Sequence, residues 1–502
     1  MLMVATTPLS FASSRWERPD GWLLAYLFFP VPVFLIGFLS PWAGVPAAVL
    51  ALMAFFICRP FVSPDTQRWS GQLIVGGVVL IAFAAGWTSL GGAGHVFHAN
   101  AIDWIPRYAV LRDLVVNDWP PRYLDKNGSE LVLRAPLGYY LMPALAGKLV
   151  GIAWADLFLM LWTWLGVALF FLANFGGTPG RRLLVLILFA AASGLDILGF
   201  LWMSDGYLPN PGYHIEWWTG RMKYSSNSTM LYWIPNHVLP GWALGAWLWR
   251  LQDSADLLRR LPVIGLAVMT WSPLPFVGAL PMIAVLAWRF RVELLTGAGE
   301  FSRTLMYVLI PALLIASYLL MSAGGIKSWA IVPPGGGGFL FMEVTLMFLL
   351  LEVLIFGAFA HQCSRSSVLV AGLVLLCLLP FVGFGPTNDL ATLGAIPALT
   401  MMWLILINEL TSPTHQRRLS NGVRVMLIML FVIGAATPFQ ETYRAMAEKH
   451  WDPDTDMPAP VALEGFPAHY FASAANRFAP LLKKSPTLSA DEMDWRKSNR
   501  LR

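Results

Sequence analysis

Long apolar runs, separated by short polar connections, set the pattern of this chain. A helix needs about 20 apolar residues to cross a bilayer core roughly 30 Å thick, and runs of that length recur here. Because a helix satisfies its own backbone hydrogen bonds in lipid, the pattern predicts an all-α transmembrane bundle. We expect about eleven full spans, near residues 21–40, 45–62, 70–90, 154–175, 182–203, 231–250, 303–322, 339–361, 367–384, 390–410 and 423–437.

Two further apolar stretches do not fit a simple span. Residues 137–151 are too few, which predicts a re-entrant or interfacial half-helix. Residues 261–290 are interrupted by Trp271-Ser272-Pro273-Leu274-Pro275. Proline lacks a backbone donor and disfavours helix at the residue before it, so this stretch predicts a hairpin of two half-helices.

The charges of the connections indicate a topology. With the N-terminus inside, 16 of the 34 Lys and Arg residues lie in short inner connections, and the rest divide between outer loops and the C-terminal tail. Short connections rich in Lys and Arg stay on the cytoplasmic side. We therefore expect a transmembrane domain over 1–437, an outer-facing tail or small cap over 438–502, and large outer loops at 91–138 and 204–230.

Composition supports a membrane protein, with 57% hydrophobic residues and a mean hydropathy of +0.60. The three cysteines fall in or near apolar segments, without the spacing of a metal site or a disulfide framework. The first span shows no cleavage site, so we expect it to be retained as the insertion signal. No nucleotide-binding signature appears, and nothing indicates a nucleic-acid partner.

The loop 91–138 concentrates the ionisable groups, with five basic and five acidic residues. From Asp103 onward, apolar residues recur at helical spacing, and Arg107 and Asp113 fall on the opposite face. This pattern predicts an amphipathic helix in the membrane interface, with its basic groups near lipid phosphates. Acidic residues also lie inside predicted spans, where they mark function or a hydrogen-bonded partner: Asp196, Glu343 and Glu352.

The order of residues in this loop resembles the first outer loop of GT-C glycosyltransferases, which include protein O-mannosyltransferases and lipid A aminoarabinose transferases. The resemblance covers about 103–182 and includes Arg107-Tyr108-Ala109, Arg134-Ala135-Pro136-Leu137 and Gly180-Arg181-Arg182-Leu183. The family usually has Asp-Glu just before Arg-Tyr, whereas here Trp104 follows Asp103. Uncharacterised bacterial members are also similar at Trp233-Ile234-Pro235-Asn236-His237 and Asn388-Asp389.

The resemblance implies a sugar donor on polyprenyl phosphate and a catalytic Asp103, acting as general base or as ligand of a divalent cation such as Mg or Mn. Arg134 and Arg107 would then hold the lipid phosphate, because a guanidinium grips phosphate oxygens in pairs. Other interpretations stay open at this point. Asp103 also suits a helix cap, and Arg134 an interfacial charge whose stem lies in lipid.

Further polar and aromatic residues are candidates to line the substrate cavity: His98, Tyr108, Tyr139, Glu216, Trp217, His237, Asn388 and Asp389. Each has an ordinary alternative. Paired tryptophans such as Trp217 and Trp218 also anchor proteins at the interface, Asn-Asp also forms turns, and a loop histidine is more often solvated than metal-bound.

Together these features predict a membrane glycosyltransferase in a bacterial cytoplasmic membrane, with the N-terminus inside and the C-terminus outside. It would move a sugar from a polyprenyl-phosphate donor to an envelope acceptor (lipid, glycan or protein). Two alternatives come from other classes: a lipid or solute transporter or flippase, whose binding sites use broken helices, and a non-catalytic membrane scaffold.

Overall fold

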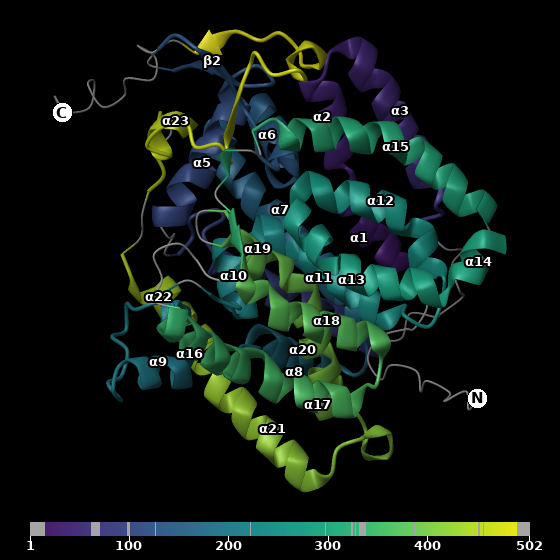
Figure 1. The fold of residues 1–502 in the computed structure, drawn as a ribbon, viewed down its shortest axis with the longest axis vertical. Coiled ribbons are helices and arrows are strands. Elements are labelled where there is room, and N and C mark those ends of the chain that lie inside the picture. The colour runs from purple at the N-terminus through teal and green to yellow at the C-terminus, as the bar shows by residue number, and fades with distance from the viewer. Residues whose placement is uncertain are drawn as a thin grey trace.

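The computed structural model describes residues 16–61, 71–97, 101–125, 127–220, 222–296, 298–322, 325–326, 328–330, 338–385, 388–449, 452–454 and 456–488, and the helices pack into one bundle (Figure 1). Its first part contains α1 (Arg18–Phe28), α2 (Pro30–Phe38), α3 (Pro41–Ile57), α4 (Gly71–Ser89), α5 (Ala101–Val116), α6 (Gly138–Val150), α7 (Ile152–Asn174), α8 (Pro179–Ala190), α9 (Asp196–Met203), the 3-10 turn η1 (Ile215–Trp217), α10 (Asn227–Trp233) and α11 (Pro235–Arg250).

The second part contains α12 (Asp256–Trp271), α13 (Pro273–Arg289), α14 (Arg291–Thr296), α15 (Ala298–Leu320), α16 (Gly338–Leu349), the π-helical segment η3 (Leu350–Leu354), α17 (Ile355–Cys363), α18 (Ser367–Leu378), α19 (Asp389–Gly394), α20 (Ile396–Thr411), α21 (Asn421–Gly434), α22 (Ala436–Ala447) and α23 (Ala459–Ala462). The strands are short: β1 (Arg122–Leu124), β2 (Glu130–Leu133), β3 (Ser328–Ala330), β4 (Val382–Phe384), β5 (Phe471–Ser473) and β6 (Thr487–Leu488).

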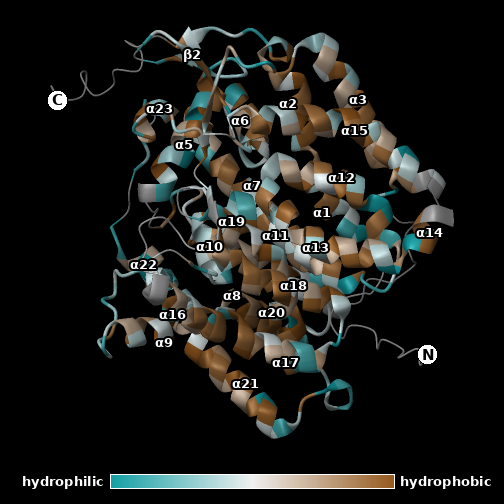
Figure 2. Ribbon diagram, in the orientation of Figure 1, coloured by the Kyte–Doolittle hydropathy of each residue, from teal (hydrophilic) through white to brown (hydrophobic). Residues whose placement is uncertain are grey.

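Six helical stretches in the described part of the chain are long and apolar enough to cross a membrane: Arg18–Phe38, Ile152–Asn174, Phe301–Leu320, Phe341–Cys363, Asp389–Thr411 and Asn421–Ala447. Figure 2 shows hydrophobic residues along α21 at the edge of the bundle, where Met429 and Val432 are exposed. Apolar side chains on an outer helix face suit a lipid environment. The helical membrane-protein class is therefore supported, while the count of eleven spans stays a prediction.

Two predicted spans are irregular. The stretch 182–203 is not continuous, because α8 ends at Ala190 and α9 begins at Asp196. The stretch 339–361 contains the π-helical segment η3. The two irregular points face each other, since a Cβ on Gly194 would lie 1.7 Å from Oε2 of Glu352. A glycine at the break is thus what makes room for a carboxyl group inside the bundle.

The stretch 261–290 breaks at Ser272, as the prolines predict, but its arms α12 and α13 are 16 and 17 residues long. The chain turns back on itself, because Arg289 at the end of α13 pairs with Asp253, just before α12, at 2.9 Å. Nearby, Arg250 pairs with Asp20, and the Arg260 guanidinium donates to the Arg59 carbonyl at 3.2 Å. These charged connections therefore share one end of the bundle, and the Ser272 turn lies away from it.

The C-terminal segment folds onto the first large loop. Strand β5 pairs antiparallel with β2, and β6 pairs in parallel with β1, giving a four-stranded sheet in the order β5-β2-β1-β6. In Figure 1 the yellow chain passes α23 and reaches β2. Residues 456–488, called the cap below, also bond the first helices, through Ser40 N to Leu481 O at 2.8 Å.

Candidate functional site

Helix α5 forms where the sequence predicts, but its polar face is not at the surface. Arg107 and Asp113 are both buried, and α6, α7 and α23 pack on the helix. Asp113 accepts bonds from Tyr123 Oη at 2.7 Å and from the backbone N of Ala459, in the cap, at 2.9 Å. The polar face is therefore covered by protein, in part by the cap, and is not open to lipid phosphates as the amphipathic pattern predicts; the interfacial position of the helix stays a prediction.

Arg107 is the centre of a polar group beside Asp103. Its guanidinium donates to Asn236 Oδ1 at 2.9 Å and bonds the Tyr140 hydroxyl. Burial alone would lower the pKa of Arg107, but Tyr140, Asp103 and Tyr470 lie close enough to raise it above its ordinary value. The half-buried Asp103 lies in the first turn of α5, where the helix dipole favours an anion.

The bonds around Asn236 define the protonation of His237. An arginine only donates, so the Asn236 oxygen faces Arg107 and its amide nitrogen faces His237 Nε2, 3.0 Å away. His237 Nε2 must then accept, which leaves the proton on Nδ1. That proton is donated to Ser272 Oγ at 2.7 Å, in the α12–α13 turn. The neutral imidazole thus ties the helix turn to the site.

Arg134 follows β2 and lies against the cap. Its backbone N donates to Tyr470 O at 2.7 Å, and Nη1 donates to His469 O at 3.3 Å. The side chain is buried, and among the described residues it forms no ion pair with a carboxylate. Burial lowers the pKa of Arg134. A buried guanidinium without a counter-charge is costly, which favours an anionic ligand at this position.

The cap residues His469 and Tyr470 are both within electrostatic reach of Asp389, His469 also of Arg134 and Tyr470 also of Arg107. Burial lowers the pKa of His469, with Asp389 acting to raise it and Arg134 to lower it. Burial raises the pKa of Tyr470 to about 12, and its other neighbours include Arg107, Asp103 and Asp389. Side chains from α5, α19, the chain after β2 and the cap therefore converge here.

Asn388 has an unusual conformation at the start of α19. Its φ of 58° lies in the left-handed region, and its carbonyl accepts bonds from the α19 backbone. The side chain does not cap the helix: it is buried, and neither Oδ1 nor Nδ2 has a hydrogen-bond partner among the residues that the structure describes. Strain combined with unused polar atoms is more typical of a binding residue than of an ordinary turn.

Other predicted site residues have different surroundings. Tyr139 Oη bonds Thr163 Oγ1 at 2.6 Å within the core, so its neighbour Tyr140 is the residue that contacts Arg107. Tyr108 is buried, with its ring 5.6 Å from that of His95. Trp217 is 41% exposed, with Lys223 Nζ 5.0 Å from its ring. His98 lies outside the described residues.

Glu216 belongs to a separate polar group. It is fully buried and accepts a bond from Ser226 N at 2.8 Å, and His214 is its nearest ion-pair neighbour.

The sequence did not indicate His469, Tyr470 or Tyr140 as site residues. For His469 and Tyr470, nothing local indicates that the cap pairs with β2. The doublet Tyr139-Tyr140 was the available signal for Tyr140, but only the rotation of α6 decides between the two.

The described residues do not form a divalent-metal site around Asp103. Its printed electrostatic neighbours include a guanidinium and two phenols, and the described part of the chain contains no group of three or more His, Cys, Asp or Glu side chains that could hold a metal ion. Mg and Mn take several oxygen ligands, with carboxylates supplying the charge. We therefore derive no step through a metal.

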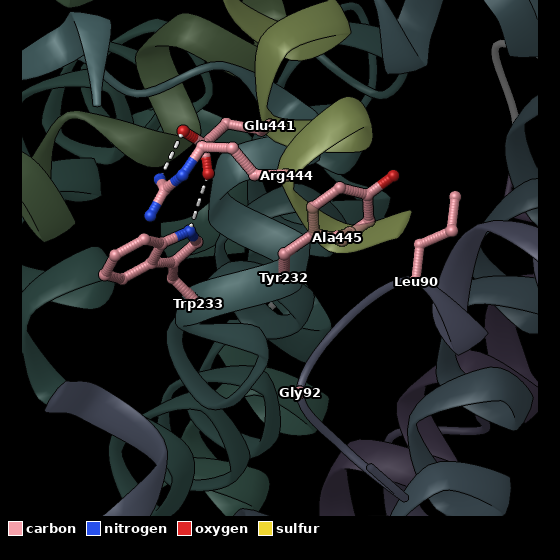
Figure 3. A pocket seen from close by; sticks show the side chains of 7 residues that line it. All are labelled: Leu90, Gly92, Tyr232, Trp233, Glu441, Arg444 and Ala445. Atoms are coloured by element: carbon pink, nitrogen blue, oxygen red, sulfur yellow. Dashed lines mark hydrogen bonds and ion pairs between the residues drawn. The ribbon is translucent and has the colours of Figure 1, made fainter. Parts of the chain in front are cut away.

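A small, open pocket lies beside Tyr232, whose carbonyl oxygen accepts a hydrogen bond from the Trp104 indole N at 2.8 Å. Figure 3 shows Glu441 between the Arg444 guanidinium and the Trp233 indole, both at 2.9 Å. Asp103 does not line this pocket. The lining residues are Leu90, Gly92, Tyr232, Trp233, Glu441, Arg444 and Ala445.

Comparisons of the chain with protein-family models, with curated proteins and with solved structures gave no significant match.

Proposed function

We propose that this protein is a GT-C-type membrane glycosyltransferase that moves a sugar from a polyprenyl phosphate to an envelope acceptor. It would work at the outer face of a bacterial cytoplasmic membrane, with about eleven spans, the N-terminus inside and the C-terminus outside. The observation that carries the proposal is Arg134, a buried guanidinium without a carboxylate partner among the described residues, in the loop where the ionisable groups gather.

A phosphate diester supplies the charge that Arg134 lacks. Desolvation of the guanidinium is offset when an anion binds, and charge-assisted hydrogen bonds to phosphate are the strong kind. Asn388, whose Oδ1 and Nδ2 have no hydrogen-bond partner in the described part of the chain, precedes Asp389 in the same region of the fold. These groups favour recognition of an anionic headgroup with polar substituents.

Asp103 is the proposed general base. The acceptor hydroxyl gives its proton to the Asp103 carboxylate as its oxygen attacks the anomeric carbon. The bond from that carbon to the phosphate oxygen breaks, and the polyprenyl phosphate leaves with its negative charge facing Arg134 and Arg107. Asn236 and Tyr140 hold Arg107 in place, which limits the reorganisation needed during reaction.

Helix α6 is the proposed wall for the lipid chain. It carries Tyr140 at its buried beginning, and at its other end Leu149 is 87% exposed. An apolar chain can thus follow one short helix from the lipid to the site. This placement explains why a half-helix, and not a full span, follows the loop.

The phosphate site is tested by measuring, with native mass spectrometry, how much undecaprenyl phosphate the purified protein binds. Arg134→Gln removes charge-assisted bonds worth about 1.5–3 kcal/mol, so affinity should fall roughly 10- to 150-fold. Arg122→Gln is the matched control: Arg122, in the neighbouring strand β1, is buried to a similar extent, but it already pairs with Glu130 at 3.3 Å and donates to Lys483 O at 2.9 Å. Equal losses in both variants would refute the assignment.

Transfer is tested in cells that lack the protein, complemented with wild type or Asp103→Asn. Mass spectrometry of glycolipids and glycans should show a product that wild type restores and Asp103→Asn does not, while that variant still binds undecaprenyl phosphate. A product restored equally by both would remove Asp103 from the chemistry.

Transport is the second candidate, favoured by the broken helix pairs α8–α9 and α12–α13. A transporter would move the labelled lipid across proteoliposomes without changing it chemically. If the Asp103→Asn variant still moves the labelled lipid, and neither it nor the wild type transfers a sugar, the protein is a transporter and not a glycosyltransferase.

A further inference from the structure

A second ionisable group, apart from the arginines, lies where α9, η1, η3 and α22 meet. Three carboxyl groups are buried there, with 0% exposure for Asp196 and Glu216 and 1% for Glu352. They come from three separate elements. Buried like charges cannot all be ionised in an apolar interior, so such a group must hold protons or cations.

The contacts of Asp196 indicate which carboxyl holds a proton. Trp218 Nε1, which can only donate, is 3.3 Å from Asp196 Oδ1, and the Ser193 hydroxyl donates to Oδ2 at 3.2 Å. Asp196 is therefore an acceptor. Glu352 is in hydrogen-bond contact with Asp196, and two ionised carboxylates have only acceptors. Because donors already face both oxygens of Asp196, the proton that joins the pair fits Glu352 better than Asp196.

The backbone is built to admit this pair. Glu352 lies on the π-helical segment η3, and π-helical turns are frequent at functional sites. The break between α8 and α9 places Gly194 against its carboxyl group, where any Cβ would collide with it. Titratable groups that face Glu352 are Asp196, Glu216 and Tyr224.

His214 connects this interior to the pocket of Figure 3. Its Nδ1 is 2.7 Å from Glu441 Oε1, and its Nε2 is 3.9 Å from Glu216 Oε2. Both His214 Nε2 and Glu216 Oε2 are buried and lack a hydrogen-bond partner among the described residues. Glu441 in turn lines the pocket beside Arg444. A histidine with one nitrogen toward each of two carboxylates is suited to pass a proton.

We propose that Glu352 and Asp196 form a proton-binding site inside the bundle, which exchanges with the pocket through Glu216, His214 and Glu441. The proton leaves Glu352 for Asp196, passes to Glu216, and then to His214 Nε2. As it arrives there, the proton on His214 Nδ1 moves to Glu441 Oε1. The net result is that one proton moves from Glu352 to Glu441, and His214 changes from the Nδ1–H to the Nε2–H tautomer. This site is independent of sugar transfer.

Infrared spectroscopy of the purified full-length protein in nanodiscs at neutral pH tests the site. A protonated buried carboxyl gives a carbonyl-stretch band, and Glu352→Gln should remove it. Glu343→Gln is the control, since Glu343 is an exposed acid one helix earlier, and it should leave the band unchanged. Asp196→Asn should keep the band but shift it, which tests the pairing even if Glu352→Gln does not fold.

The exchange route is tested with the same band after transfer to D₂O. His214→Gln should slow the isotope shift by about tenfold or more, because a positioned proton-transfer group is lost. Glu441→Gln interrupts the same chain and replaces that variant if it fails to fold. Three outcomes would overturn the proposal. The first is a carbonyl band that survives Glu352→Gln, and the second is an exchange rate that His214→Gln leaves unchanged. The third is a band that vanishes when a sodium salt replaces a choline salt in the buffer, which would indicate a sodium site.

Discussion

Asp113 holds the cap to the first large loop, and its replacement by alanine gives a quantitative test of that assembly. The carboxylate is fully buried and bonds Arg112 Nη1 at 2.8 Å, Tyr123 Oη at 2.7 Å and Ala459 N at 2.9 Å. These partners come from α5, β1 and the cap. Asp113→Ala removes the acceptor of all three donors, and two of these donors, Tyr123 and Ala459, are fully buried.

The expected cost follows from these bonds. A charge-assisted hydrogen bond contributes about 1.5–3 kcal/mol, and removal of one partner from a buried charged group costs about 3–5 kcal/mol. Relief of the desolvation of Asp113 offsets part of this. We expect a net loss of about 3 kcal/mol for cap docking, which is roughly a 100-fold increase in the opening equilibrium.

Hydrogen exchange measured by mass spectrometry reports the opening directly. Peptides from 456–488 and from β1 should lose protection in Asp113→Ala, while peptides from α20 should not change. Asp118→Ala is the matched control, because Asp118 is an exposed acid in the same loop. Unchanged protection of the cap, or equal loss in the control, would refute the role assigned to Asp113.

Three further outcomes are expected. Burial raises the pKa of Asp113, although the hydrogen bonds from its donors act to lower it, so the folded state binds a proton on this carboxyl more tightly than the unfolded state does. The stability of cap docking should therefore be greatest in acid, and it should fall as the pH rises from about 4 through the raised pKa of the folded state. Asp113→Asn should abolish this pH dependence. Gly194→Ala should lower the free energy of unfolding by about 2 kcal/mol or more, because the added Cβ would collide with the Glu352 carboxyl group. Thermal denaturation measures this loss. Gly180→Ala is the control and should be neutral, because a Cβ at Gly180 would meet open space. Asn388→Gly should raise the melting temperature by relieving strain worth about 1 kcal/mol, yet weaken binding of undecaprenyl phosphate; unchanged binding would argue against a ligand role.

The helices, and the helix break at Ser272, were predictable because their sequence signals are local. The apolar runs indicate the bundle, and the prolines after Trp271 indicate the break at Ser272. The interruption between α8 and α9 gave no such signal. At this break the carboxyl group of Glu352, a residue about 160 positions away in the sequence, lies beside Gly194.

The candidate site was predictable only in part, for the same reason. Asp103, Arg107 and Arg134 stand out as charges in one loop, and the structure places Asp389 in the same region through His469 and Tyr470. The exposure expected for the polar face of α5 was wrong, because amphipathicity does not reveal what covers that face. Protein covers it here, through cap contacts that span more than 300 residues of sequence.

The pairing of the cap with the loop has a consequence for biosynthesis. Asp113 and Ala459 are 346 residues apart, so β1 and β2 are made long before the strands that complete their sheet. At about 5–20 residues per second, the ribosome needs roughly 20–70 s to reach those strands. During this interval Arg134 has no His469 carbonyl to bond, and the nascent loop exposes open strand edges. A chain that terminates early would insert its helices and still leave this assembly unfinished.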